Sequence, residues 1–210
     1  MTGYHSPDNW ENDYARRGRI WAGAMYQHIP LDDGKRVLEL GCGNGKTCNA
    51  LLEKKCQVVG IDFSSSAVHL CRSHMPKNAK GHFAIADVCN LPFYDASFDA
   101  VTAFHVIGHI LAEGRNRCAR EAARVLRPGG TLYFSDFSTY DFRAGIGVEI
   151  ELQTFSRKNG IGTHYFSEDE VSALFHLLVP RELQTRYWTM KVRGQLLHRA
   201  EISASFTKKI

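Results

Sequence analysis

Three glycines follow directly on a short apolar run near residue 40, and an acid stands just before them. The stretch from residue 37 reads V-L-E-L-G-C-G-N-G, which contains Glu39, Gly41, Gly43 and Gly45. Glycine lets the backbone turn sharply and lets a ligand approach closely, because it has no Cβ. The spacing differs from the G-x-G-x-x-G of dinucleotide sites, and an acid is unfavourable beside a pyrophosphate. The loop therefore favours a cationic ligand over a dinucleotide.

Two further acids end apolar runs later in the chain. Asp62 follows Gly43 by 19 positions, where Rossmann-type sites place an acid that accepts from ribose hydroxyls. Asp87 and Val88 come at the end of a third run and would place a carboxylate and an apolar side chain near an adenine ring. Each feature also has a plain structural explanation, because glycines can form a simple turn, Asp62 can cap the next helix and Asp87 can hold a loop. Together they favour one ligand that contains a nucleoside.

Short apolar runs alternate with helical stretches from residue 36 onward, which indicates βαβ units and a parallel sheet. We expect strands at 36–40, 57–62, 82–87, 98–104 and 131–136, helices at 45–54, 65–74, 113–126 and 167–178, and closing strands at 183–190 and 201–208. The chain is expected to form one domain made of an N-terminal lid segment (1–34), a cofactor-binding core (36–136), a partly helical substrate-side insertion (137–166) and a closing helix and strands (167–210). The loop and the acids should meet at the carboxyl ends of the strands.

Four motifs occur in order across residues 36–136. They read E-L-G-C-G-N-G at 39–45, I-D-F-S at 61–64, A-D-V-C-N-L-P-F at 86–93 and R-V-L-R-P-G-G at 124–130. This set resembles the class I S-adenosylmethionine-dependent methyltransferases, in particular their small-molecule type. The resemblance implies an α/β fold with a Rossmann-like doubly wound sheet, in the strand order 3-2-1-4-5-7-6 with strand 7 antiparallel. It also implies S-adenosylmethionine as cofactor and S-adenosylhomocysteine as product.

Family roles then fall on residues near the carboxyl ends of the first four strands. The resemblance assigns the methionine moiety to Glu39, backbone approach to Gly41 and Gly43, the ribose to Asp62 and the adenine to Asp87 with Val88, and it adds Phe63 and His105 as cofactor contacts.

Methyl transfer from a sulfonium is an in-line displacement, so the protein mainly aligns the acceptor with the methyl group and excludes water. The stretch F-H-V-I-G-H-I after the fourth strand offers His105 and His109 as candidate catalytic residues, because histidine can remove a proton near neutral pH. Alternatively, His105 packs on the methionine end of the cofactor and His109 belongs to the next helix start. An anionic acceptor needs no base, and no metal site is expected.

Aromatic residues gather in the first 30 positions, and Trp10, Tyr14 and Trp21 are spaced by four and seven residues. This spacing places them near one face of a helix, which could close over the cofactor and exclude water. The candidates for the lid and the acceptor site are Tyr4, Trp10, Tyr14, Trp21, Arg143, His164 and Tyr165. Core packing is the alternative for each aromatic residue, and a solvated surface charge is the alternative for Arg143.

Composition limits the remaining choices. The net charge of +4 comes from 26 basic and 22 acidic residues without a long run of one sign, so nucleic-acid binding is neither required nor excluded. The start of the chain lacks an export signal and the chain lacks a long apolar span, so we expect a soluble cytoplasmic protein that does not insert into membranes. Its six cysteines are expected to be reduced thiols, and the protein to be a monomer or homodimer.

Three functions compete at this stage. A small-molecule acceptor is favoured, because the front segment and one insertion suffice to enclose a metabolite pocket. RNA is the less favoured acceptor: the G-C-G-N-G-K stretch and the arginine-rich helix around residues 115–124 also resemble tRNA wobble-uridine methyltransferases, which need a basic face. The third alternative is a protein that binds S-adenosylmethionine without catalysis.

Overall fold

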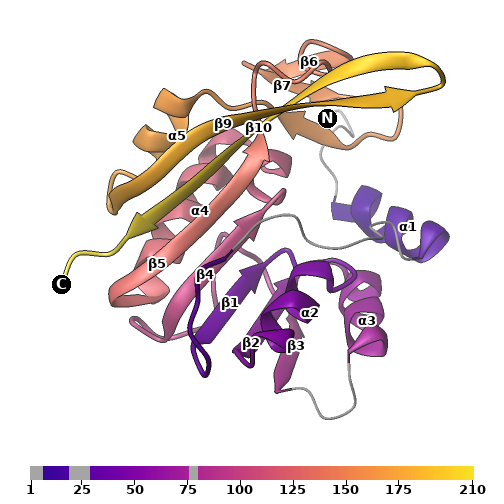
Figure 1. Ribbon diagram of the computed structural model, residues 1–210. Helices are drawn as coiled ribbons and strands as arrows, with labels where there is room; N and C mark the ends of the chain where they lie inside the picture. The colour runs from indigo at the N-terminus through magenta and orange to yellow at the C-terminus, as the bar shows by residue number, and fades with distance from the viewer. Residues whose placement is uncertain (1–6, 19–28, 76–79) are drawn as a thin grey trace.

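A seven-stranded sheet with helices on both faces forms the body of the computed structural model, which describes residues 7–18, 29–75 and 80–210 (Figure 1). Its strands are β1 (Arg36–Leu40), β2 (Gln57–Asp62), β3 (Gly81–Ile85), β4 (Phe98–Phe104), β5 (Leu126–Phe137), β9 (Val179–Val192) and β10 (Gln195–Thr207). They lie in the order β3-β2-β1-β4-β5-β10-β9, and β10 runs antiparallel to β5. Counted among these strands alone, the order is 3-2-1-4-5-7-6 with an antiparallel seventh strand. The fold predicted from the sequence is confirmed.

Two layers of helices cover the sheet because the side chains of its strands alternate in direction. The helices are α1 (Pro7–Arg17), α2 (Lys46–Glu53), α3 (Ser65–His74), α4 (Ala112–Val125) and α5 (Glu168–Leu174), with a 3₁₀ turn η1 (Ile107–His109). Val37 of β1 packs in one apolar cluster with Leu51 of α2 and Val68 of α3. Leu38, its neighbour, packs in the other cluster with Ala122 of α4. Both faces of β1 are therefore buried, as expected of a central parallel strand.

The register of the parallel strands brings their carboxyl ends to one edge. Leu40 pairs with Ile61 of β2 and with Ala103 of β4, and Asp62 pairs with Ile85 of β3. The glycine loop after β1 and the residues that follow β2, β3 and β4 consequently share this edge, which positions the candidate site.

The insertion between β5 and α5 differs from the expectation of a partly helical segment. It contains β6 (Val148–Glu151), β7 (Thr154–Ser156) and β8 (Gly162–His164), which form a small antiparallel sheet. The segment 154–156 is buried between two partner strands, so pairing and burial decide its structure and local helical spacing does not.

The closing elements keep their predicted types but change their lengths. β9 and β10 extend well beyond 183–190 and 201–208 as one long hairpin, whereas α5 ends before residue 178. The Ser167 hydroxyl caps α5 by accepting from the Glu170 backbone N–H at 3.1 Å, and the Glu170 carboxylate contacts a His164 ring nitrogen. In the described part of the chain, no helix combines the length and apolar character needed to cross a bilayer.

Candidate active site

The glycine loop is narrow because neighbouring side chains lie directly on it. Gly41 and Gly43 have φ values of +66° and +50°, a left-handed conformation that favours glycine. A Cβ at Gly41 would lie 2.7 Å from a Val106 methyl group, and one at Gly43 would lie 2.6 Å from the Tyr14 hydroxyl oxygen. The loop therefore has the backbone surface that a closely approaching ligand needs, with α1 above it.

Asp62 connects this loop to the end of β2. Its carboxylate accepts from the Gly43 and Ser64 backbone N–H groups, each at 3.0 Å, and burial raises its pKa to about 6. The bond from the Ser64 N–H is local and lies at the start of the next helix, as the structural alternative for Asp62 expected. The bond from the Gly43 N–H joins the Asp62 carboxylate to the glycine loop. Both contacts hold Asp62 at the edge where a ribose contact is expected.

We expect Asp62→Ala to weaken S-adenosylhomocysteine binding by about 1 to 3 kcal/mol, because hydrogen bonds to a charged group would be lost both by the loop and by the ligand. Calorimetry on the folded variant measures this effect. Asp99→Ala is the matched control, since Asp99 accepts from the Arg36 N–H at 2.8 Å at the start of β1, the opposite end of that strand from the glycine loop. Equal affinities of wild type and Asp62→Ala would contradict the assignment.

Glu39 lies beneath the loop. Its side chain belongs to a residue only 2% exposed, and its carboxyl group accepts from the Thr102 hydroxyl of β4. Burial raises the pKa of Glu39 well above its ordinary value, which favours the neutral carboxyl group. The expected contact with the methionine moiety stays a prediction.

The residues predicted for the adenine end lie on the next two strand ends. Phe63 directly follows Asp62 and is 43% exposed, which leaves an apolar surface beside the loop. Asp87 is exposed and Val88 is half-buried. The Asp87 carboxylate accepts from the Cys89 N–H at 2.8 Å, so it also holds its own loop.

His105 follows β4 and sits between two carboxylates. It has a left-handed φ of +53°, and its ring nitrogens lie 3.7 Å from an Asp136 oxygen and 3.5 Å from a Glu201 oxygen. Burial lowers the pKa of His105, but the two carboxylates outweigh burial and raise it to about 9. The ring also lies 4.5 Å from that of Phe137. Near neutral pH His105 is therefore an imidazolium that faces the two carboxylates and cannot accept a proton.

His109 has the opposite electrostatic character. Burial lowers its pKa, so the ring is neutral near pH 7. Its Nδ1 lies 2.7 Å from the Gly162 carbonyl oxygen. Because a carbonyl only accepts, Nδ1 carries the hydrogen and Nε2 keeps a lone pair. Of the two histidines, His109 is the one that can take up a proton.

Helix α1 bridges the site from α3 to the insertion. The Trp10 ring lies 4.8 Å from that of His109 and 5.9 Å from that of Tyr14. The Asn9 side chain donates to the Gly160 carbonyl at 3.0 Å. Two of the predicted lid aromatics thus lie over the glycine loop and His109, whereas Tyr4 and Trp21 fall outside the described residues.

The insertion residues divide into two groups. The Arg143 guanidinium lies 3.8 Å from the centre of the Phe137 ring and donates to Asp141 at 2.7 Å. Tyr165 is fully buried, with its ring 6.4 Å from that of Phe137. His164 lies apart from them, since its two ring nitrogens contact Thr154 and Glu170, each at 2.8 Å. Arg143 and Tyr165 therefore adjoin His105 through Phe137, and His164 fastens the insertion to α5.

Asp136 and Glu201 were missed by the sequence reasoning. Asp136 has a fully buried side chain and accepts from the Gly108 N–H at 2.7 Å. Its position at the end of an expected strand, like that of Asp62, was a usable signal. Glu201 comes from β10, and only the antiparallel register opposite Phe137 brings it to His105.

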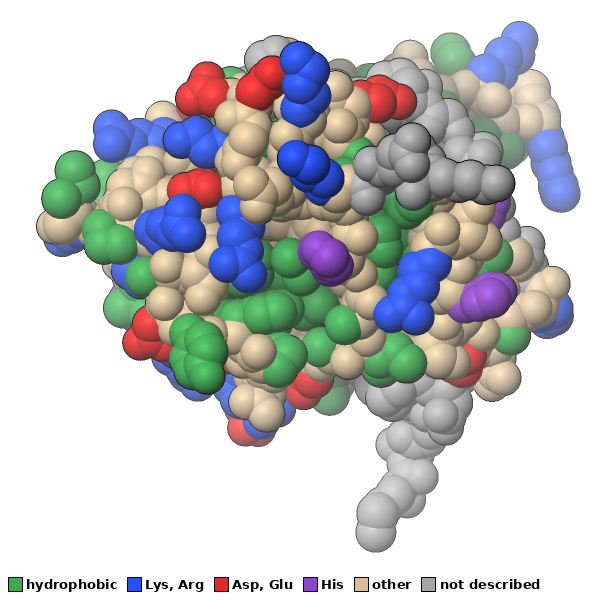
Figure 2. Space-filling model, turned by 90° about the horizontal axis from the view of Figure 1, so that it is seen from below, with side chains coloured by type: hydrophobic (Ala, Val, Ile, Leu, Met, Phe, Trp, Pro, Cys, Tyr) green, Lys and Arg blue, Asp and Glu red, His purple; other side chains and the backbone are tan. Residues whose placement is uncertain are grey.

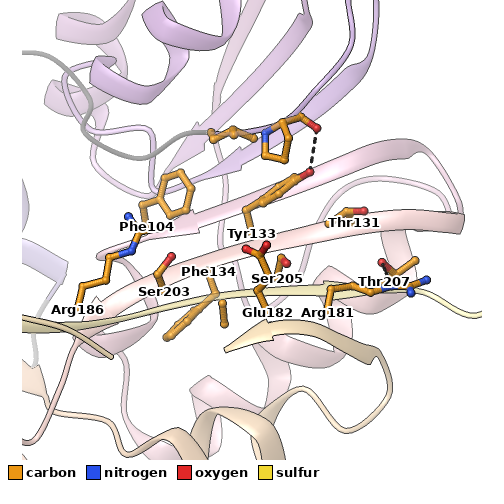
Figure 3. Close-up of a pocket in the computed structure, with 13 residues that line it drawn as sticks. Phe104, Thr131, Tyr133, Phe134, Arg181, Glu182, Arg186, Ser203, Ser205 and Thr207 are labelled. Carbon is orange, nitrogen blue, oxygen red and sulfur yellow. Dashed lines mark hydrogen bonds between the residues drawn. The ribbon is translucent and has the colours of Figure 1, made fainter. Parts of the chain in front are cut away.

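A separate hollow of about 280 Å³ lies on the face of β5, β10 and β9 (Figure 3). Phe104 and Arg186 line one end, and Thr207 and Arg181 line the other. The hydroxyl groups of serine, threonine and tyrosine line much of it. Such a polar wall does not provide the dry surroundings expected around a reacting methyl group, so we place the reaction at the strand edge.

Comparison with known proteins agrees with the fold. A family model described as a methyltransferase domain matches residues 38–134. The chain is 30% identical over 84% of its length to tRNA N(3)-methylcytidine methyltransferase Mettl2 of Drosophila melanogaster, and 36% identical over 59% of its length to 27-O-demethylrifamycin SV methyltransferase of Amycolatopsis mediterranei. It spans 59% and 46% of these relatives, about half of their length. A solved structure of a methyltransferase from Methanosarcina mazei matches 88% of this chain and 99% of its own, with a TM-score of 0.72 at 23% identity.

Proposed function

Since the chain belongs to the class I S-adenosylmethionine-dependent methyltransferase family, we propose that it transfers the cofactor's methyl group to an acceptor nucleophile beside His109. The cofactor supplies an electrophilic methyl carbon on a positively charged sulfur. The acceptor lone pair forms the new bond to that carbon as the carbon–sulfur bond breaks, and the sulfur keeps the bonding electrons. His109 Nε2 takes the acceptor proton. The neutral state of His109, with Nδ1 fixed on Gly162, carries the proposal.

The charges around His105 favour binding of the positively charged sulfonium end of the same cofactor. Asp136 and Glu201 together bring two negative charges, and the His105 imidazolium brings one positive charge. Carboxylates in a partly buried site attract a sulfonium more strongly than they would in water, so this pair of acids supports a cationic ligand beside His105.

We expect His109→Gln to lower kcat by about 100- to 10,000-fold, the range for loss of a general base, with little change in S-adenosylhomocysteine affinity. His176→Gln is the control, because His176 is exposed just beyond α5. Because the pKa of His109 is lowered, wild-type kcat should be level around neutral pH and fall only as the pH drops below the ordinary histidine value of 6.5. Unchanged turnover in His109→Gln would remove the base from the mechanism.

For the acceptor we propose a small molecule, as the sequence favoured. The contacts with Gly160 and His109 hold α1 across the glycine loop, and a covered site favours an acceptor of metabolite size. The rifamycin relative is named for such an acceptor.

RNA is the second candidate, because a single base turned out of its strand is equally small. The Drosophila relative, which matches the larger share of this chain, is named for tRNA. Incubation with methyl-tritiated S-adenosylmethionine and either a metabolite extract or total RNA separates the two classes by the fraction that becomes labelled. Absence of label and of S-adenosylhomocysteine with both would favour a non-catalytic binding protein.

A further inference from the structure

The far end of the β9–β10 hairpin leaves the sheet as a two-stranded ribbon. β10 pairs with β5 only from Glu201 onward, so residues 187–200 have strand partners only in the hairpin itself, while the Ala200 and His198 carbonyls also accept from the Ser138 and Phe142 N–H groups. Every residue from 186 to 196 is exposed. In Figure 1 the ribbon runs past β6 and β7 to its turn at the upper right, at the end of the sheet toward which β1 and β4 point. Its surface is therefore available beside the site.

The ribbon carries charge of one sign. Residues 184–200 contain four Lys or Arg residues and no Asp or Glu. The Arg199 guanidinium forms an ion pair with the Asp141 carboxylate, with nitrogen and oxygen 2.6 Å apart. No acid of the described chain forms an ion pair with Lys191 or Arg193. On the face seen in Figure 2, by contrast, acidic and basic side chains lie interspersed. The ribbon therefore fits an anionic partner, and pairing with the ribbon of a second copy would bring like charges together.

Exposed aromatic rings lie among these charges. Tyr187 is 64% exposed and Tyr140 is 70% exposed, and their rings are 6.1 Å apart. Trp188 is 39% exposed, with the Arg199 guanidinium 5.2 Å from its ring centre. Rings beside cationic side chains are the combination on which unpaired bases stack while their phosphates are neutralised.

The ribbon is continuous with the methyl-transfer site. The Arg199 guanidinium also lies 5.1 Å from the centre of the Phe137 ring. The centre of the Phe137 ring in turn lies 4.5 Å from that of the His105 ring. Tyr140 follows Phe137 by three residues and contacts Tyr187, so a strand bound along these two rings would lead toward the catalytic edge.

We propose that residues 184–200, together with Tyr140, bind an unpaired polynucleotide strand. The bases stack on Tyr140 and Tyr187. Lys191, on the same face of β9 as Tyr187, and Arg193, just beyond the end of β9, contact phosphates. The inference rests on the proposed function only for the place where methyl transfer occurs. It goes beyond the small-molecule acceptor proposed above and gives the second candidate, RNA, a docking surface.

The charge of the ribbon is tested with fluorescein-labelled oligouridine of about 20 nucleotides, longer than one typical single-strand site. Fluorescence anisotropy at several salt concentrations should show that the double variant K191E/R193E binds more weakly than wild type. Its slope of log K against log salt should be smaller by about 1.4, from two lost contacts at about 0.7 each. K80E/K209E makes the same change in net charge at exposed positions outside the ribbon and should bind like wild type.

The stacking is tested by Y140A/Y187A, which should weaken oligouridine binding by about 5- to 150-fold if one base loses its platform. Y94A is the control, because Tyr94 is 90% exposed outside the ribbon. Oligothymidine in the same assay shows whether the ribbon requires ribose. The affinity for S-adenosylhomocysteine should stay unchanged in all these variants. This measurement distinguishes loss of polynucleotide binding by the ribbon from loss of cofactor binding.

Several outcomes overturn the proposal. If K80E/K209E lost as much oligouridine affinity as K191E/R193E, the effect would come from net charge alone. If both ribbon variants bound oligouridine like wild type, the strand would bind elsewhere. Binding of phosphatidylserine vesicles without binding of either oligonucleotide would make the ribbon a membrane contact. A doubling of mass in solution that Y140A/Y187A abolishes, again without oligonucleotide binding, would make it an interface between copies of this chain.

Discussion

Replacing Gly43 by valine should abolish binding of S-adenosylhomocysteine by a chain that still folds. The new Cβ would lie 2.6 Å from the Tyr14 hydroxyl oxygen, so α1 must move away from the loop. The two further methyl groups would occupy the space through which a ligand approaches the backbone. We expect the affinity for S-adenosylhomocysteine to fall by at least about 100-fold, because the added methyl groups block the approach of the ligand and α1 no longer covers it. Calorimetry gives the affinity, and circular dichroism shows whether the fold remains.

Gly34→Val separates this effect from backbone strain. Gly34 has a φ of +79°, but nothing lies within 4 Å of a Cβ placed there. A side chain in the left-handed region costs about 1 to 2 kcal/mol at either position, so both variants should lose similar stability. Only Gly43→Val should lose the ligand. A folded Gly43→Val protein that binds with wild-type affinity would argue that the ligand lies elsewhere.

The cofactor half of the site could be predicted from sequence because its determinants are local. The glycines, Asp62 and Asp87 stand at strand ends, and parallel pairing brings strand ends to one edge whatever the rest of the chain does. The Ser167 cap is local in the same way, because donor and acceptor are three residues apart.

The acceptor half could not be predicted in the same way because its contacts join distant segments. Glu201 reaches His105 only through the register of β10 on β5, and this pairing leaves His109 as the candidate base. His105 is already protonated near neutral pH, whereas burial lowers the pKa of His109 and a carbonyl of the insertion fixes its tautomer. No spacing in the sequence encodes either contact. The insertion itself was expected to be partly helical and is a small sheet.

The attachment of α1 is another of these long-range contacts, and it leads to the second large expected effect. The Glu11 carboxylate accepts from the Ser64 hydroxyl at 2.7 Å, the Ser66 hydroxyl at 2.6 Å and the Ser66 N–H at 3.2 Å, at the start of α3. The bond from Ser66 contributes most to lowering the pKa of Glu11 to about 2. Because this pKa is below the ordinary value of 4.5, the contact stabilises the fold fully above about pH 4.5 and is lost as pH falls toward 2.

We therefore expect Glu11→Ala to release α1 near neutral pH, where the contact is complete. Trp10 and Tyr14 would then no longer stay over His109 and Gly43, and water would enter the site. Turnover should fall at least about tenfold, the scale expected when a lid no longer closes, and the amide hydrogens of α1 should exchange faster in the presence of S-adenosylhomocysteine. Glu113→Ala is the matched control, because Glu113 is an exposed acid in the first turn of α4. If Glu11→Ala kept full turnover while its α1 amides exchanged freely, helix α1 would not be the cover that excludes water, and that role would pass to Arg143 and Tyr165 on the insertion side.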